Sequence, residues 1–406
     1  MSQSHNETGS SRRFALFHVT HGVNSGGEQM VSRLVAQLCK VLESPPILIT
    51  QRECPSIDAA RAVGAEGQVL PFPTELDIYD HGLLRVAKVP VLLRSLSRYG
   101  KALRRVLSER RVGVLWCSNL RGVVTALPAT LGHGIPVIWN IWLPPRRSLG
   151  MRMLVWISLL SSWRVLLEYF AQKDRVFTEL QRRLFGSKFR VIYTGYDAER
   201  FESVVACQRA ELGVGSHGGL VATAGLLTPR KGQDLLVRAM ATVCREEEAD
   251  LVIMGDSIPS NPGGSQYRDS LRSLAAELGI ADRIHLVGWR DDALDVIAAC
   301  DVFVSASYGE GLPGAVREAM GLGKAIVATD AGGSAEALGD AGFVVTCGDA
   351  DALAEKIVCL LRCDSLRKSM GEGARTRFRT LFSTDQLVKS YAGLISELYQ
   401  CKGIRV

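Results

Sequence analysis

Short apolar runs alternate with amphipathic helical patterns along almost the whole chain, and this alternation constrains the fold more than any other feature. Strand–helix–strand repeats of this kind predict an α/β fold, with parallel sheets flanked by helices. The alternation forms two series, each of roughly 180 residues, which is a usual size for one domain. The expected strands are 13–20, 45–50, 112–119, 134–142 and 189–195 in the first series, and 219–227, 249–256, 284–288, 301–307, 324–330 and 342–347 in the second.

The two series predict two Rossmann-like domains, over residues 13–196 and 197–383, joined near 193–201. Residues 1–12 are polar and are expected to form a flexible tail. The last segment, 384–406, begins with a predicted helix that follows both series, and it can pack on either domain, including a return to the first. Ligands of open parallel sheets bind outside the carboxyl ends of the strands, so two such domains facing each other would form a cleft.

Cysteine usage and hydropathy favour a reduced cytosolic protein. The ten cysteines are scattered through hydrophobic stretches without any CxxC pair, and CLLRC (359–363) has no histidine nearby to complete a zinc site. The most apolar run, MLVWISLLSSW (153–163), has eleven uncharged residues, whereas a spanning helix needs about twenty. The N-terminal residues lack the apolar segment of a secretory signal.

Charge is divided unequally between the two halves. Residues 1–196 carry 26 Lys and Arg against 13 Asp and Glu, whereas the remainder carries 22 against 29. Much of the excess lies in 85–111, which holds nine basic residues and one acid within an amphipathic helical pattern. Such a helix can lie on an anionic membrane, or it can pack on the core with a solvated basic face. Nucleic-acid binding is not expected, because no recognised module accompanies the charge.

The segment YGEGLPGAVREAMGLGKAIVATDAGGSAE (308–336) carries the most specific pattern. Pro313 fits the first turn of a helix, where a missing backbone N–H costs nothing, so Glu310 precedes that helix and Glu318 lies within it. The helix start supplies free N–H groups and a partial positive charge that suit a diphosphate. By itself the pattern fits a diphosphate site between two carboxylates, or an exposed loop and a helix with solvated glutamates.

This segment resembles the signature of the family 4 retaining glycosyltransferases, two glutamates separated by seven residues (EGxxxxxxEAM), which reads EGLPGAVREAM here. GKAIVATDAGGSAE is similar to the family's GxPVVATxxGGxxE, TPRKGQDLL to its phosphate loop, and IYTGYDAERF to its inter-domain segment. The resemblance covers nearly the whole second series. It implies the GT-B fold, in which two Rossmann-like domains with parallel sheets face a central cleft, and sugar transfer with retention from a nucleotide-sugar to a glycan or lipid-linked acceptor.

The resemblance also implies roles for single residues. Glu318 should hold the ribose hydroxyls and Glu310 the transferred sugar, while Lys231 and Arg230 should neutralise the donor diphosphate. Fixed cations stabilise the charge that builds on a leaving diphosphate, and the resemblance implies that neither a metal ion nor a cofactor is required. The donor-binding residues expected on this basis are Gly26, Gly27, Gly255, Asp256, Trp289, Arg290, Gly311, Leu312, Pro313, Gly314 and Glu318.

Some positions depart from the family pattern. Leu226 stands where the family often has an arginine, a role that the neighbouring Arg230 can take over. In the first domain VIWNIWLPP has Trp142 where a cleft histidine is usual. His21, Asn140 and Trp142 are the candidates for the acceptor side, whereas His18 and His133 are expected to be structural or solvated. DAD (349–351) is similar to the metal motif of another glycosyltransferase fold, but it opens a predicted helix and is expected to cap it.

Alternative functions remain open on the sequence. An epimerase or a phosphorylase of the same fold would use the same donor residues. A non-catalytic nucleotide-sugar-binding partner of another transferase is disfavoured, because Glu310, Lys231 and Glu318 are all present. The expected location is cytoplasmic, with peripheral binding to the cytoplasmic face of the membrane as the alternative that the basic half suggests.

Overall fold

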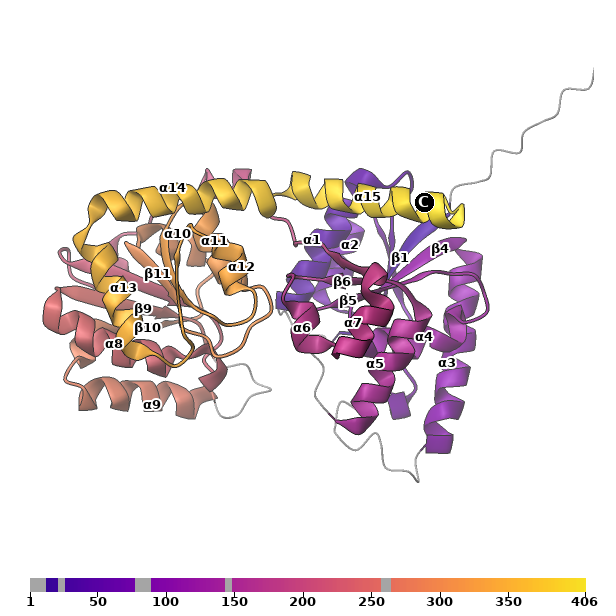
Figure 1. The fold of residues 1–406 in the computed structure, drawn as a ribbon, viewed down its shortest axis with the longest axis horizontal. Helices are drawn as coiled ribbons and strands as arrows, with labels where there is room; N and C mark the ends of the chain where they lie inside the picture. The colour runs from indigo at the N-terminus through magenta and orange to yellow at the C-terminus, as the bar shows by residue number, and fades with distance from the viewer. Residues whose placement is uncertain (1–11, 21–25, 77–88, 143–147, 257–263) are drawn as a thin grey trace, which may run out of the picture. The chain divides into compact units, whose positions relative to one another are not determined.

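The computed structural model of the chain describes residues 12–20, 26–76, 89–142, 148–256 and 264–406. These residues group into two units (Figure 1). The first holds the described residues up to Glu168, then Lys173–Gly195 and Thr384–Val406, and the second holds Tyr169–Gln172 and Tyr196–Ser383.

Each unit is built on one parallel sheet, and both sheets share one topology. The first sheet has the order β3-β2-β1-β4-β5-β6-β7 and the second the order β10-β9-β8-β11-β12-β13. Numbered by their order in the chain, the first six strands of each sheet run 3-2-1-4-5-6 across the sheet. This is the Rossmann order. The first sheet consists of β1 Arg13–His18, β2 Ile47–Thr50, β3 Glu66–Val69, β4 Val112–Cys117, β5 Val137–Ile141, β6 Ser162–Leu167 and β7 Phe189–Val191. The second consists of β8 Gly219–Ala224, β9 Ala249–Met254, β10 Ile284–Gly288, β11 Val302–Ser305, β12 Ala325–Thr329 and β13 Phe343–Val345.

Helices cover both faces of the first sheet, because its strands are apolar on both sides. One hydrophobic cluster joins the sheet to α1 (Gly26–Val41), α2 (Pro55–Ala62) and α15 (Thr384–Lys402). A second cluster joins the other face to α3 (Val89–Glu109), α4 (Leu120–Thr130) and α5 (Leu149–Ser161). The short helices α6 (Gln172–Val176) and α7 (Glu179–Phe185) follow β6.

The second unit carries its own helices. Those of one face, α8 (Gln233–Glu246), α9 (Gly264–Glu277) and α13 (Ala350–Arg362), share a cluster with the sheet. The others are α10 (Ala293–Ala299), α11 (Gly314–Gly321), α12 (Ser334–Leu338) and α14 (Asp364–Leu381), and α11 contacts α10 and α14. Single 3-10 turns lie at Thr74–Leu76, Gly186–Lys188, Glu199–Phe201, Arg209–Leu212, Pro229–Lys231 and Ala281–Arg283.

Two strands lie where the sequence pattern does not indicate them. Strand β3, with the sequence EGQV, is a half-buried edge strand without an apolar alternation. Strand β6 begins inside the apolar run 153–163: α5 ends at Ser161 and the strand starts at Ser162. No helix among the described residues combines the length and the hydropathy needed to cross a membrane.

The chain crosses between the units beside Tyr196, whose backbone N–H donates to the carbonyl of Phe382 at 2.8 Å. Beyond this point α15 returns to the first unit (Figure 1) and buries Leu387, Tyr391 and Leu398 against α1 and the sheet. Tyr169–Gln172, which the sequence places in the first domain, belongs to the second unit instead. The Phe170 N–H donates to the Glu336 carboxylate at 2.7–2.8 Å. This hydrogen bond holds the segment on the second unit.

Candidate functional site

The second sheet reverses its strand order between β8 and β11, which are neighbours in space. The loops that leave their carboxyl ends are residues 225–232 and 306–313. An open parallel sheet binds its ligands at such a switch point. The candidate site is therefore built by these two loops and by the start of α11.

A cluster of ion pairs and hydrogen bonds joins the two loops. Lys231 Nζ donates to Glu310 Oε1 at 2.5 Å, and Ser307 Oγ donates to the same oxygen at 2.8 Å. Arg230 Nη1 donates to the Gly309 carbonyl at 2.5 Å and lies 3.4 Å from Glu310 Oε2. The Glu310 side chain is 9% exposed, whereas the side chains of Lys231 and Arg230 are 21% and 50% exposed. One buried carboxylate thus holds two cations at the surface of the site.

Two glycines allow close backbone contacts around loop 306–313, Gly232 in the loop after β8 and Gly332 in the loop after β12. Gly232 has φ +64°, and a Cβ there would lie 2.0 Å from the carbonyl oxygen of Ala306. Gly332 has φ +65°, and a Cβ would lie 2.2 Å from the carbonyl oxygen of Glu310. Both conformations are costly for residues other than glycine, and the second explains the first glycine of DAGGSAE.

A small pocket lies beside this cluster at the start of α11. Lys231 and Glu310 line it together with Thr223, Gln233 and Gly314. Helix α11 begins at Gly314, with Pro313 as its N-cap residue at φ −65°, so the first N–H groups of the helix are not used by helical bonds. Lys231 and a helix start meet at this pocket, and Arg230 lies next to Lys231 outside its lining, an arrangement that suits a phosphate-bearing ligand.

Glu318 lies in the interior of α11, as the spacing predicts, and is partly buried. The pocket lining among the described residues includes Pro313 and Gly314 but not Glu318, Gly311 or Leu312. Gly311 instead accepts a hydrogen bond from the Gly333 N–H at 2.7 Å, and Leu312 is buried.

The loops after β9 and β10 carry the remaining expected donor residues. Gly255 and Asp256 follow β9, and the Asp256 carboxylate pairs with Arg268 at 2.5 Å. Trp289 follows β10 and is 61% exposed. Arg290 binds both oxygens of Asp292, which lowers the pKa of that carboxyl. These residues lie at the carboxyl edge of the sheet but outside the pocket lining.

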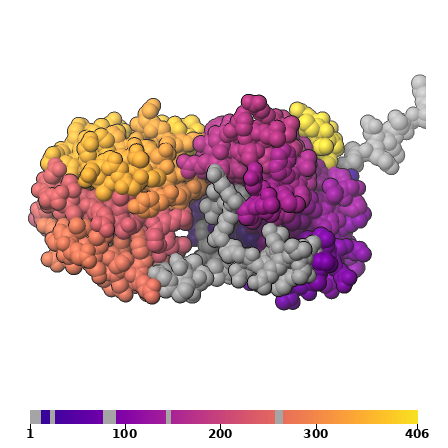
Figure 2. Space-filling model, turned by 60° about the horizontal axis from the view of Figure 1, so that its bottom comes forward, coloured from indigo at the N-terminus to yellow at the C-terminus, as the bar shows by residue number. Residues whose placement is uncertain are grey.

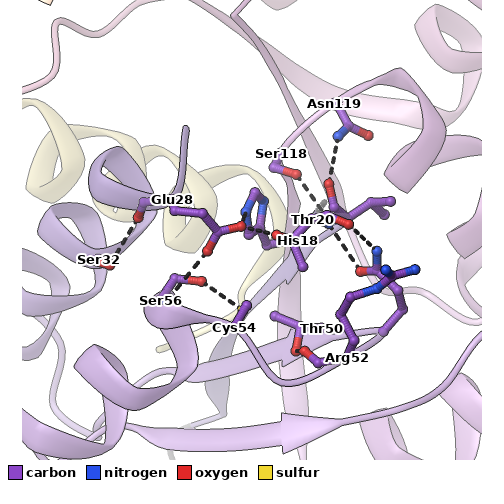
Figure 3. A network of polar contacts seen from close by, with 12 residues as sticks. His18, Thr20, Glu28, Ser32, Thr50, Arg52, Cys54, Ser56, Ser118 and Asn119 are labelled. Atoms are coloured by element: carbon purple, nitrogen blue, oxygen red, sulfur yellow. Dashed lines mark hydrogen bonds and ion pairs between the residues drawn. The ribbon is translucent and has the colours of Figure 1, made fainter. Parts of the chain in front are cut away.

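The corresponding edge of the first sheet holds a buried polar network (Figure 3) around Glu28 in the first turn of α1. His18 Nε2 lies 3.0 Å from Glu28 Oε1, Thr20 Oγ donates to the same oxygen, and the Ser56 N–H donates to Oε2 at 3.3 Å. Burial raises the pKa of Glu28, but the hydrogen bonds from His18 and Ser56 outweigh it, so the pKa is lowered overall. The network ties α1 to β1 and α2 directly beside the glycine pair.

Of the three acceptor-side candidates, the structure describes Asn140 and Trp142. His21 lies outside the described residues. Gly26 and Gly27 form the first two residues of α1. Asn140 is buried in β5, and the Trp142 ring lies edge-on to His18, with the ring centres 5.8 Å apart. The position of the usual histidine is therefore filled by an aromatic ring that packs on the His18–Glu28 pair.

Sequence reasoning missed Ser307, Gln233 and Glu28. Ser307 and Gln233 flank the recognised KG and EG motifs, and only their contacts single them out. Glu28 directly follows GG, and an acid in the first turn of a helix is itself a signal. Asp349 caps α13 through the Ala352 N–H at 2.9 Å, as predicted for DAD. No group of three or more His, Cys, Asp and Glu within the described ranges is placed to hold a metal ion.

Comparisons with known proteins agree with this geometry. The Glycosyl transferases group 1 family matches residues 218–363. The lipopolysaccharide core biosynthesis glycosyltransferase LpsE of Rhizobium meliloti is 31% identical over 195 residues, which are 48% of this chain and 54% of that protein. A D-inositol 3-phosphate glycosyltransferase of Saccharomonospora viridis is 32% identical over 213 residues, 50% of this chain and 49% of that protein. The chain thus spans about half the length of the curated relatives it matches.

Solved structures are similar over almost the whole chain. Anabaena Alr3699/HepE, crystallised with UDP, aligns with a TM-score of 0.77 at 19% identity, covering 95% of this chain and 100% of that one. A glycosyltransferase from Rickettsia africae aligns with a TM-score of 0.78 at 18% identity, covering 96% and 99%. At these identities the structures establish the fold. The chain therefore has the GT-B fold, and its residues 218–363 match the Glycosyl transferases group 1 family.

Proposed function

We propose that this chain is a retaining glycosyltransferase that moves a sugar from a UDP- or GDP-sugar to a hydroxyl of a glycan. The observation that carries the proposal is the cluster of Lys231, Arg230 and Glu310 at the switch point of the second sheet. Two cations beside a helix start fit a diphosphate, and a carboxylate next to them fits sugar hydroxyls. The relatives named as glycosyltransferases and the UDP-bound structural neighbour support the same function.

The proposed reaction breaks the bond between the anomeric carbon and the diphosphate oxygen and forms a bond from that carbon to the acceptor oxygen. Negative charge then builds on the leaving diphosphate, where Lys231, Arg230 and the N–H groups at the start of α11 stabilise it. The acceptor proton passes to the departing diphosphate, and attack on the same face retains the configuration. Glu310 would orient the transferred sugar, and Glu318 the ribose.

The proposal assigns the nucleotide to the second unit and the acceptor to the first. Gly26 and Gly27 would face the donor phosphates from the first unit, and Asn140 and Trp142 would lie on the acceptor side. A lipid-linked or cell-surface glycan precursor is the proposed acceptor, consistent with the relatives named for lipopolysaccharide core biosynthesis. We place the reaction in the cytoplasm and assign the charge compensation to Lys231 and Arg230 without a metal, so transfer should persist in excess EDTA.

A ligand screen identifies the donor. Thermal unfolding of the purified chain is followed with UDP-, GDP- and ADP-sugars, because a bound ligand stabilises by RT ln(1+[L]/Kd). A rise in Tm with one base and with the matching diphosphate identifies the donor class. The absence of any rise with all three would contradict the proposal.

Glu310→Ala tests the catalytic assignment. Sugar transfer should fall at least a hundredfold (about 2.7 kcal/mol), while Glu372→Ala, an exposed glutamate on α14, should leave it unchanged. Unchanged transfer in Glu310→Ala would exclude the proposed role. Donor turnover without an acceptor, or strict dependence on phosphate, would instead indicate an epimerase or a phosphorylase. Binding without any turnover would indicate a non-catalytic partner of another transferase.

A further inference from the structure

Helix α5 exposes a row of large apolar side chains to solvent. Its opposite face packs into the core through Val155 and Leu159. Spacings of four, four and three residues place the exposed side chains on one face of the helix. They are Leu149, Met153, Ile157 and Leu160, with exposed fractions of 77%, 60%, 39% and 67%. The one charged residue of α5 is Arg152, which is also exposed. The solvent-facing side of α5 is therefore mostly apolar, whereas the solvent-facing side of a surface helix is usually polar.

Helix α3 begins in a similar way. Val91 and Leu93 are 49% and 60% exposed, and Arg94 and Arg98 are exposed beside them. Further along, the apolar face of α3 is used by the core, where Leu103 and Leu107 are buried. The helix therefore does not offer its whole apolar face to a membrane, as the sequence pattern alone suggests, but only its first turns.

The topology brings these two helix starts to one edge. Both helices connect parallel strands and run opposite to them, so they begin at the carboxyl edge of the sheet. They lie on one face of the sheet with α4 between them, as the contacts show and as can be followed in Figure 1. Residues near 150–190, magenta in Figure 2, lie at the surface of the first unit.

The charge of these helix starts is mainly positive, with Glu75 beside Ser95 and Arg98 of α3 as an acidic neighbour. Neither helix has an acidic residue in its first turn, although the helix dipole favours one there. Within the described ranges, no acidic side chain forms an ion pair with Arg94 or Arg152. The arginines and the positive helix ends therefore add to one another, and an anionic partner would compensate both.

We propose that the α3–α5 surface, formed by Val91, Leu93, Arg94, Arg98, Leu149, Arg152 and Met153, docks on an anionic lipid bilayer. The apolar side chains would enter the boundary between headgroups and acyl chains, and the arginines would pair with lipid phosphates. A second copy fits less well, because a two-fold contact would bring two sets of three arginines together with only Glu75 of each copy as an acidic neighbour among the described residues. The inference adds a partner to the proposed function, since the same sheet edge would then receive a lipid-linked acceptor.

Vesicle sedimentation tests this surface with the purified full chain, without donor or acceptor. The protein should sediment with phosphatidylcholine vesicles that contain phosphatidylglycerol, should stay in solution with phosphatidylcholine alone, and should be released by salt. Leu149→Ser with Met153→Ser should lower partitioning by on the order of tenfold. Arg94→Gln, Arg98→Gln and Arg152→Gln together should lower it by on the order of a hundredfold.

Matched variants control for exposure and charge. Val205→Ser with Tyr399→Ser changes side chains that are 76% and 58% exposed elsewhere on the protein. Arg200→Gln, Arg245→Gln and Arg272→Gln remove three exposed arginines of the second unit. Both controls should retain partitioning within about twofold, and an unchanged Tm in each variant should show that folding is intact.

The inference would be overturned if the wild-type protein did not sediment with anionic vesicles. An equal loss of partitioning in the surface variants and in the controls would also overturn it. So would a dimer that dissociates in Leu149→Ser with Met153→Ser while the wild type does not bind lipid. The transferase proposal is tested separately by donor binding. If Glu310→Ala left transfer unchanged while vesicles still bound, the proposed function would fail and the docking surface would stand.

Discussion

Lys231 Nζ lies 2.5 Å from Glu310 Oε1, although 79 positions separate the two residues in the chain. The pair joins the loop after β8 to the loop after β11, and both residues line the pocket at the start of α11. If Lys231 binds the donor diphosphate as proposed, the diphosphate would compete with Glu310 for this ammonium group, and donor binding would change the position of the Glu310 carboxylate.

Lys231→Met should weaken binding of the donor diphosphate. A hydrogen bond to a charged group contributes about 1.5–3 kcal/mol, so Kd for the nucleoside diphosphate should rise roughly 10- to 150-fold. Isothermal titration calorimetry measures the change. Lys368→Met, which removes a lysine that is 73% exposed on α14, should leave Kd unchanged. Equal affinity of Lys231→Met and wild type would rule out a phosphate contact.

Gly232→Ala should destabilise the second unit. The residue has φ +64°, and the new Cβ would lie 2.0 Å from the Ala306 carbonyl oxygen, so the loop must move at a cost of about 1–3 kcal/mol or more. Urea unfolding measures the loss. Gly393→Ala is the matched control, because this glycine lies in the exposed part of α15 with nothing within 4 Å of the new Cβ, and a gain of about 0.5–1 kcal/mol is expected.

Glu28→Gln should change the pH dependence of stability. The pKa of Glu28 is below its ordinary value of 4.5 in the folded chain, so the ionised carboxylate stabilises the fold above pH 4.5. That contribution is lost as pH falls through the lowered pKa. The difference in unfolding free energy from wild type should be about 1–3 kcal/mol at neutral pH and should shrink below pH 4.5.

Denaturant unfolding between pH 3 and 8 measures this difference. Glu53→Gln serves as the control, because Glu53 pairs with Arg61 at the surface and is 64% exposed, where such pairs contribute about 0–1 kcal/mol. A gap between Glu28→Gln and wild type that does not change with pH would contradict the assignment of the buried carboxylate as ionised.

Glu397→Gln should loosen the attachment of α15 to the first unit. Glu397 accepts from Arg164 on β6 and from Arg190 on β7, and the hydrogen bond from Arg164 is the main cause of its lowered pKa. The loss should be about 1–2 kcal/mol, and faster amide exchange should be confined largely to α15. Glu355→Gln, a glutamate that is 71% exposed on α13, should change neither quantity.

Periodicity in the sequence predicts the α/β class, the two series and the order in which Glu310, the helix start and Glu318 follow one another, because these depend on residues close together in the chain. The same local signal fails at β3, whose EGQV is neither apolar nor alternating, and at β6, which continues the apolar run of α5 without a break. In both cases the strand is specified by the neighbouring strand with which it pairs rather than by its own side chains.

Local pattern alone determined that this chain forms two Rossmann-like units and that a helix starts shortly after Glu310. Only the tertiary structure decided that α15 returns to the first unit, that Lys231 pairs with Glu310, and that the core uses most of the apolar face of α3 while one face of α5 stays exposed. The reason is that periodicity shows which face of an element is apolar, whereas the partner of that face depends on contacts between residues far apart in the sequence.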